Sequence, residues 1–170
     1  MNQEQSFAAG MTSPSLASPG MPAALPALPI SANTQPLPRL LWVDDSRMLL
    51  SLYQSVFESL GFQVLATSSP NEALQHLSSH GIDVAILDYD MPEMDGGALA
   101  SLIKDQCPML PVVLYSGNTS IPHVARRWVD AVCAKGAPRA ELLATIERLS
   151  QHAQQQENNR LRTFAPSSNH

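Results

Sequence analysis

The chain has few cysteines and no long apolar run, and each shortage excludes a class of protein. Its 170 residues include two cysteines, Cys107 and Cys133, which are too few for a disulfide framework and suit a reducing compartment. No stretch approaches the ~18 consecutive apolar residues of a transmembrane helix. The N-terminus also lacks the basic region and the apolar core of a signal peptide. We therefore expect a cytoplasmic protein without membrane insertion.

Charge is scarce as well, and its balance is acidic. Ten Lys and Arg face 15 Asp and Glu, which gives a formal net charge of −5. A broad phosphate-binding surface needs an excess of cations, so we expect no direct binding of nucleic acid. The hydrophobic share of 44% is ordinary for a folded protein, and the length suits one domain.

The two ends of the chain differ in composition from its middle. Residues 1–38 hold seven of the 14 prolines and a single charged residue, Glu4. Proline breaks helices and cannot donate to a sheet, so we predict a disordered, Pro-rich tail at 1–38, either a solvated leader or a docking segment. Residues 153–170 are polar and are predicted to form a C-terminal tail. The folded domain is therefore placed at residues 39–152.

Short apolar runs alternate with amphipathic segments across this domain. Ser46 and Gly61 mark the start and the stop of one helix, and Ser69 with Glu72 forms a capping box for the next. Such alternation predicts an α/β fold, a doubly wound five-stranded parallel sheet of order 2-1-3-4-5 that is flavodoxin-like. The predicted strands are 40–43, 62–66, 82–87, 112–115 and 131–134, and the predicted helices are 46–60, 70–79, 97–106, 119–128 and 138–152.

Polar residues follow four of the predicted strands at the point where each strand ends. In the order 2-1-3-4-5, these carboxyl ends converge on one crevice between strands 1 and 3. An aspartate after a strand is often only a helix cap, and capping alone could account for the acidic pair after strand 1. The converging residues are Asp44 and Asp45 after strand 1, Asp88 and Asp90 after strand 3, Ser116 after strand 4, and Lys135 after strand 5.

This combination predicts phosphoryl-transfer chemistry. Clustered carboxylates repel one another unless a cation lies between them, and hard oxygen ligands at a shallow site favour Mg²⁺. A metal ion and an ammonium group can neutralise phosphoryl oxygens while a carboxylate attacks the phosphorus in line. Helix capping alone does not account for two acidic strand ends, a hydroxyl and a lysine at four converging strand ends.

Four sequence strings resemble the receiver domain of two-component response regulators. The resemblance covers about residues 39–150, and its most specific part is the Asp-x-x-Met-Pro-x-Met-Asp-Gly string. The strings are VDDS at 43–46, DYDMPEMDG at 88–96, SG at 116–117 and KG at 135–136.

The resemblance implies a role for each converging residue. It implies a single-domain response regulator with slow autodephosphorylation, not an enzyme. Its partners would be a sensor histidine kinase or histidine phosphotransfer protein, and a downstream target protein. By this resemblance Asp88 takes the phosphoryl group, Lys135 pairs with it and Ser116 is the switch hydroxyl, while Asp44, Asp45, Asp88 and Asp90, the last through its backbone carbonyl, bind Mg²⁺.

The sequence also departs from this family in the readout region. An aromatic residue often stands three positions before the lysine, where this chain has Val132, and a proline often follows the lysine, where this chain has Gly136. Trp128, next to Arg126 and Arg127, has two open interpretations. It either packs in the core or is an exposed anchor on the face that changes on phosphorylation.

A phosphatase of the haloacid-dehalogenase type is the alternative function. Members of that family place an Asp-x-Asp after an apolar strand, then a Ser or Thr, then a Lys, as Asp88, Asp90, Ser116 and Lys135 would do. They begin with the nucleophile strand, however, and carry an acidic motif after the lysine. Here the acidic pair comes before, at Asp44 and Asp45. Turnover of a generic phosphate ester would distinguish the two hypotheses.

Overall fold

Five parallel strands form the centre of the structure, a computed structural model that describes residues 37–79, 81–118 and 120–164. Most of the tail predicted at 1–38, and the end of the one predicted at 153–170, lie outside the described residues. The spatial order of the strands is β2-β1-β3-β4-β5, as predicted. They are β1 (Arg39–Val43), β2 (Gln63–Thr67), β3 (Val84–Leu87), β4 (Val112–Ser116) and β5 (Ala131–Ala134).

The strands are apolar runs because helices cover both faces of the sheet. Every residue of β3 and β4 is buried, which fits central strands of a parallel sheet. The pairing of β1 with both β2 and β3 sets Leu41 beside Leu65 on one side and Ala85 on the other. This pairing brings the ends of β1 and β3 next to each other.

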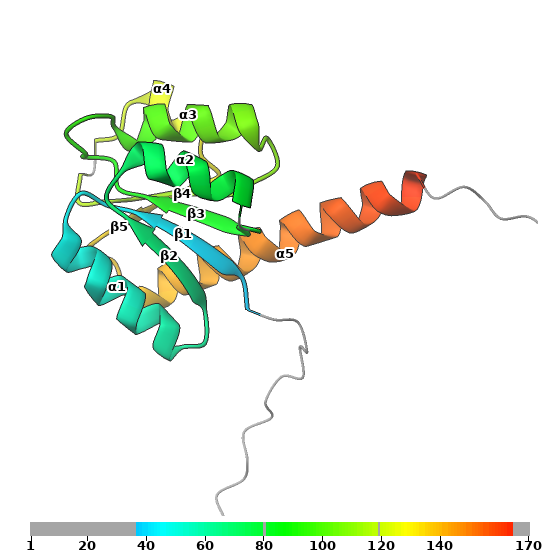
Figure 1. Ribbon diagram of the computed structural model, residues 1–170, viewed down its shortest axis with the longest axis horizontal. Coiled ribbons are helices and arrows are strands. Elements are labelled where there is room, and N and C mark those ends of the chain that lie inside the picture. The colour runs from blue at the N-terminus through cyan, green and yellow to red at the C-terminus, as the bar shows by residue number, and fades with distance from the viewer. Residues whose placement is uncertain (1–36, 80, 119, 165–170) are drawn as a thin grey trace, which may run out of the picture. The chain divides into compact units, whose positions relative to one another are not determined.

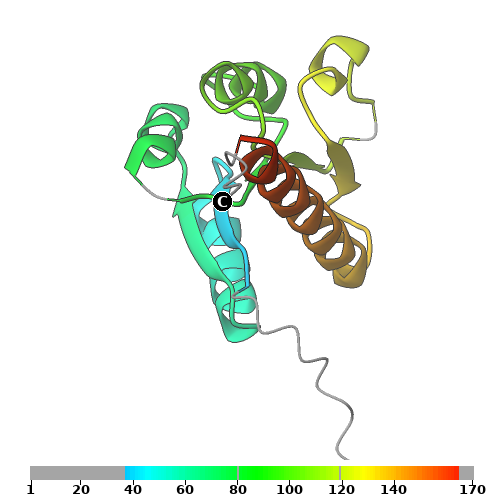
Figure 2. The same ribbon diagram turned by 90° about the vertical axis from the view of Figure 1, so that its right-hand side faces the viewer.

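The helices form a layer on each side of the sheet (Figures 1 and 2). Helices α1 and α5 cover the face that carries Trp42 and Ile86, whereas α2, α3 and α4 cover the face that carries Val43 and Leu87. Each face thus has its own apolar core. The helices are α1 (Arg47–Ser59), α2 (Pro70–Ser79), α3 (Gly96–Gln106), α4 (His123–Arg126) and α5 (Arg139–Phe164).

Local signals fix the first two helices. The Ser46 hydroxyl accepts a hydrogen bond from the backbone N–H of Leu49, and Gly61 takes a φ of 95° after α1, so the predicted cap and stop are confirmed. The capping box of α2 is only half formed. Ser69 accepts from the Glu72 N–H as predicted, but the Glu72 carboxylate accepts from the hydroxyl of Thr67 instead of turning back to Ser69.

The prediction of a helix over 119–128 was too long. Side-chain turns occupy the loop after β4, where the Ser116 hydroxyl accepts from the N–H of Asn118 and the Asn118 side chain accepts from the N–H of Ser120. Pro122 then precedes the single turn of α4. The chain between β4 and β5 therefore supplies one helical turn and not three.

The last helix is longer than predicted. It runs to Phe164, whereas we expected an end near His152. No glycine or proline interrupts residues 139–164, and Gln, Glu, Arg and Leu favour helix. At about 1.5 Å per residue the helix is about 39 Å long. No helix among the described residues is long and apolar enough to cross a membrane.

Candidate functional site

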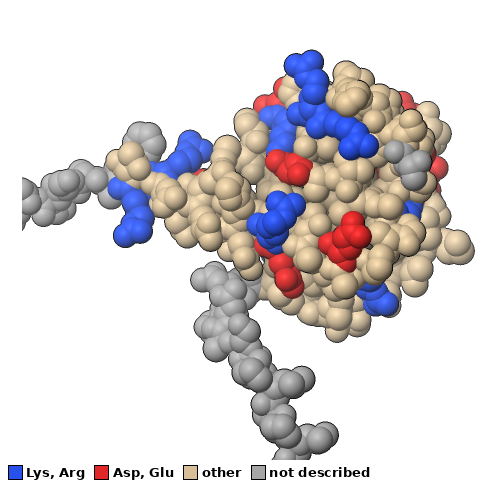
Figure 3. All heavy atoms as spheres, turned by 180° about the vertical axis from the view of Figure 1, so that it is seen from behind, with Lys and Arg blue, Asp and Glu red and all other residues tan. Residues whose placement is uncertain are grey.

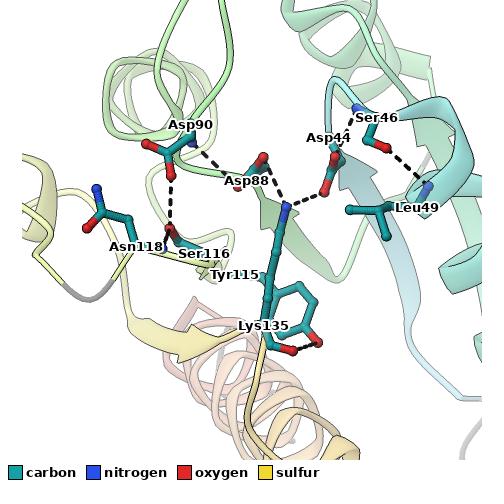
Figure 4. A network of polar contacts seen from close by, with 9 residues as sticks. All are labelled: Asp44, Ser46, Leu49, Asp88, Asp90, Tyr115, Ser116, Asn118 and Lys135. Atoms are coloured by element: carbon teal, nitrogen blue, oxygen red, sulfur yellow. Dashed lines mark hydrogen bonds and ion pairs between the residues drawn. The ribbon is translucent and has the colours of Figure 1, made fainter.

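The carboxyl ends of the strands bring the predicted residues together (Figure 4). Asp44 and Asp88 follow β1 and β3 directly, and both side chains are almost fully buried. The Asp88 N–H donates to the carbonyl oxygen of Val43 at 2.8 Å, which holds the two strand ends side by side. Ser116 ends β4, and Lys135 follows β5.

Lys135 bridges the two buried carboxylates. Its Nζ lies 2.7 Å from Asp44 Oδ2 and 3.0 Å from Asp88 Oδ2. Its backbone N–H donates to the carbonyl oxygen of Ser116 at 2.9 Å, so the start of the side chain is fixed against β4. Lys135 therefore links Asp44 and Asp88, which follow β1 and β3, to the loop after β5.

The carboxylates of Asp44, Asp45 and Asp88 form a candidate metal site. One oxygen from each lies within 4.8 Å of the others, and Asp45 is exposed to solvent. Ligands on opposite sides of a Mg²⁺ ion are about 4.2 Å apart, so small inward movements would close this set around the ion. Three carboxylates and one ammonium group leave an excess of negative charge, which a divalent cation would offset. The donor set fits Mg²⁺.

Burial and charge set the protonation of the central pair. Burial raises the pKa of Asp88 above its ordinary value, and the hydrogen bond and charge of Lys135 offset this increase only in part. Burial also acts to lower the pKa of Lys135, but Asp44 and Asp88 raise it overall. The lysine therefore stays protonated at neutral pH, and Asp88 is a more basic carboxylate than an exposed aspartate.

Asp90 lies apart from the carboxylate triad. Its side chain is exposed and points toward Ser116, whose hydroxyl donates to Asp90 Oδ2 at 3.5 Å (Figure 4). Its backbone N–H donates to Asp88 Oδ1 at 3.4 Å. Asp90 thus contacts Asp88 through its backbone, and its role toward a metal stays a prediction. Ser116 is buried and is linked to Asp88 through Asp90, which contacts both residues.

Sequence reasoning missed an aromatic cluster behind the site. Tyr115 precedes Ser116 on β4, and its ring lies 5.4 Å from Tyr53 and 5.8 Å from Trp42. Its hydroxyl donates to the carbonyl oxygen of Lys135 at 3.5 Å, and burial raises the pKa of Tyr115 to about 12. Alternation along the strands places Trp42 and Tyr115 on one face and could have indicated this cluster.

The start of α3 is packed directly on Asp88. A Cβ atom on Gly96 would lie 2.2 Å from the carbonyl oxygen of Asp88, so only glycine fits there. Asp95 caps the helix by accepting from the N–H of Ala98 at 2.8 Å. The Asp-Gly pair that ends the predicted motif therefore fixes α3 against the end of β3.

The fold and the site together define a class of proteins, the doubly wound domains with an acidic pocket at the carboxyl edge of a 2-1-3-4-5 sheet. The family model of the response regulator receiver domain matches residues 40–147, well over half of the chain. The chain belongs to this family.

Two relatives in sequence support this assignment. The chain is 37% identical over 93 residues to the C4-dicarboxylate transport transcriptional regulatory protein DctD of Rhizobium meliloti, a match that covers 55% of this chain and 20% of DctD. It is 39% identical over 80 residues to the response regulator SaeR of Staphylococcus epidermidis, with coverage of 47% and 34%. The matches therefore span about a third or less of these relatives.

Solved structures show the same fold. The response regulator TrrA of Thermotoga maritima, whose crystal structure contains Mg²⁺ and BeF, matches with a TM-score of 0.62 and 23% identity. The match covers 66% of this chain and 99% of TrrA.

Residues 40–147 are therefore a receiver domain, which is a phosphoacceptor signalling module. Receiver domains are phosphorylated by histidine kinases and bind Mg²⁺ at an aspartate triad such as Asp44, Asp45 and Asp88. The phosphatase alternative loses its support, because the acidic pair follows β1 and lies beside the end of β3, as the receiver arrangement requires.

Proposed function

We propose that the chain is a single-domain response regulator of the cytoplasm. A sensor histidine kinase or a histidine phosphotransfer protein supplies the phosphoryl group, Asp88 accepts it, and the phosphorylated form binds a downstream protein. The observation that carries the proposal is the position of Asp88. This buried carboxylate lies 3.0 Å from the Lys135 ammonium and within one cluster with Asp44 and Asp45.

The transfer needs one nucleophilic oxygen and a compensated charge. A carboxylate oxygen of Asp88 attacks the phosphorus of the donor phosphohistidine, the new O–P bond forms as the P–N bond breaks, and the donor imidazole leaves with the bonding pair. Lys135 is positioned to neutralise a phosphoryl oxygen. Asp44, Asp45 and Asp88, with the backbone carbonyl of Asp90, would hold Mg²⁺, which supplies further charge neutralisation when bound.

Ser116 is the proposed switch because its buried hydroxyl ends β4 beside Asp90, directly before the loop that leads to α4. It now donates weakly to Asp90 and accepts from the N–H of Asn118 at 2.9 Å. A phosphoryl group on Asp88 offers strong acceptor oxygens, so the hydroxyl is expected to turn toward it and to shift the loop that leads to α4. Val132 is partly buried and too small to follow as an aromatic ring would.

Labelling by a small acyl phosphate tests the proposed acceptor. Purified full-length chain is incubated with acetyl phosphate and Mg²⁺, and the mass increase of one phosphoryl group is measured. Asp88→Asn should abolish labelling, whereas Asp105→Asn, which changes an exposed aspartate on α3, should label like wild type. EDTA should also abolish labelling. Full labelling of the Asp88→Asn variant would refute the assignment.

A further inference from the structure

Trp128 stands between two hollows on the surface formed by α3 and α4. One hollow has a volume of about 310 Å³ and is lined by Tyr89, Ser101 and Val124 among others. The other has a volume of about 350 Å³ and includes Lys104 and Arg127. Trp128 lines both. We call these two hollows with Trp128 the α3–α4 groove.

The short α4 leaves large apolar side chains of this groove in contact with water. Trp128 is 37% exposed and Val124 is 65% exposed, whereas the other tryptophan, Trp42, is 1% exposed. An exposed tryptophan beside an exposed valine is typical of contact surfaces. Of the two interpretations of Trp128, the exposed anchor is therefore the one that fits.

The groove has a positive end. Arg127 lines the second hollow, and Arg126 precedes it in the chain. Both are exposed, and neither belongs to an ion pair among the residues that the structure describes, although Nε of Arg126 donates to the carbonyl oxygen of Ile121 at 3.1 Å. Lys104 and Asp130 neutralise each other there at 2.8 Å. Figure 3 shows Lys and Arg side chains gathered at the top of the domain, the height at which α3 and α4 lie in Figure 1. Asp95 lines the first hollow, so the cation of the groove that has no ion-pair partner among the described residues is Arg127 in the second hollow. This cation favours a partner that brings a carboxylate to the second hollow.

Both walls of the groove are attached to the phosphoacceptor site. α3 begins at Gly96, which lies against the Asp88 carbonyl, and α4 follows the loop that starts at Ser116. The two helices touch at Gly97, where a Cβ atom would lie 2.5 Å from that of Ala125. A change at Asp88 or Ser116 therefore reaches the groove through two short connections.

We propose that the α3–α4 groove binds an amphipathic helix of a partner protein, with its apolar stripe against Trp128 and Val124 and a carboxylate at Arg127. The eleven residues of α3 give a wall about 16 Å long, which matches three turns of a docked helix. The inference rests on the proposed function in one respect, because the phosphorylated form should bind the helix more tightly.

Peptide selection tests this inference on the full chain. A display library of random 16-residue peptides is selected against the chain activated with Mg²⁺ and beryllofluoride. The enriched peptides should carry apolar residues at helical spacing together with Asp or Glu. Trp128→Ala and Arg127→Glu should each weaken their binding about tenfold or more. Leu161→Ala, which removes a side chain that is 62% exposed on the far part of α5, should leave the affinity unchanged.

Two further measurements keep the test decisive. Val124→Ser alters the same groove at a more exposed position, so it replaces Trp128→Ala if that variant unfolds. With Trp42→Phe in the background, Trp128 is the sole tryptophan, and its emission should shift to shorter wavelength when a peptide binds.

The inference would be overturned if the selection enriched basic peptides or no peptides. It would also be overturned if the groove variants bound the enriched peptides as tightly as wild type does. Labelling of Asp88 is measured on the same samples. If labelling fails, the proposed function is wrong. If labelling succeeds and no Trp128-dependent peptide appears, only the groove proposal is wrong.

Discussion

The proposed role of Asp88 needs a buried carboxylate that is ionised. Its surroundings stabilise the ionised form only in part. Burial disfavours the ionised carboxylate, Asp44 adds a like charge, and one ammonium group is shared between the two. The net result is a pKa above the ordinary value of 3.8. The proposed nucleophile is thereby held in an ionised state that its burial disfavours.

This conflict predicts that Asp88→Asn stabilises the metal-free domain at neutral pH. A carboxyl whose folded-state pKa is raised contributes stability below its unfolded pKa, and this stability is lost as pH rises through the folded value. At pH 7 the wild-type carboxylate is therefore a net cost that asparagine lacks. Urea unfolding in EDTA should give a higher free energy of unfolding for Asp88→Asn at pH 7, and the difference should shrink as pH falls toward 4. Asp105→Asn should show neither effect, and a less stable Asp88→Asn variant at pH 7 would contradict the pKa argument.

At the scale of elements, the junction between β3 and α3 is the most constrained part of the site. The helix N-terminus lies so close to the strand end that a single added carbon has no room at Gly96. The loop after β4 is the opposite case, because a Cβ atom on Gly117 would meet no atom within 4 Å. One loop is thus fixed by packing, and the other has space in which to move.

Gly96→Ala and Gly117→Ala should therefore differ strongly. The first forces a methyl group onto the Asp88 carbonyl and the Leu114 side chain, so it should lower the free energy of unfolding by about 3 kcal/mol or more and displace Asp88. The second should change it by less than about 0.5 kcal/mol. Thermal unfolding and acetyl phosphate labelling of both variants check this. Equal stability of the two would show that the close approach at Gly96 is relieved at little cost.

At the scale of the whole molecule, the sequence allowed the strand order and the meeting of the site residues to be predicted, because both depend on local patterns and on the ends of parallel strands. The length of α4 could not be predicted, since side-chain turns at Ser116 and Asn118 compete with helix only in the folded loop. The extent of α5 exceeds the prediction because its polar second half contains no glycine or proline that would end the helix. The Tyr115 cluster depends on contacts between β1, α1 and β4, which no single segment reveals.

The described core lies entirely within residues that follow Pro38, which leads to a prediction for the whole chain. Both apolar clusters begin at β1, with Leu40 on one face and Leu41 on the other. Deletion of residues 1–36 should therefore change the free energy of unfolding by less than about 0.5 kcal/mol and leave the rate of Asp88 labelling within twofold. Urea unfolding and a labelling time course measure these quantities. A large loss of stability would show that the deleted segment packs on the domain.

The ammonium of Lys135 gives the acidic pocket a resident counter-ion that belongs to the chain. Since this group already sits between Asp44 and Asp88, the pocket does not depend on a captured ion to hold β1 and β3 together. Assembly of the domain and loading of its metal can then be separate events. The chain is therefore expected to fold without Mg²⁺, so that only the proposed phosphoryl transfer depends on the ion.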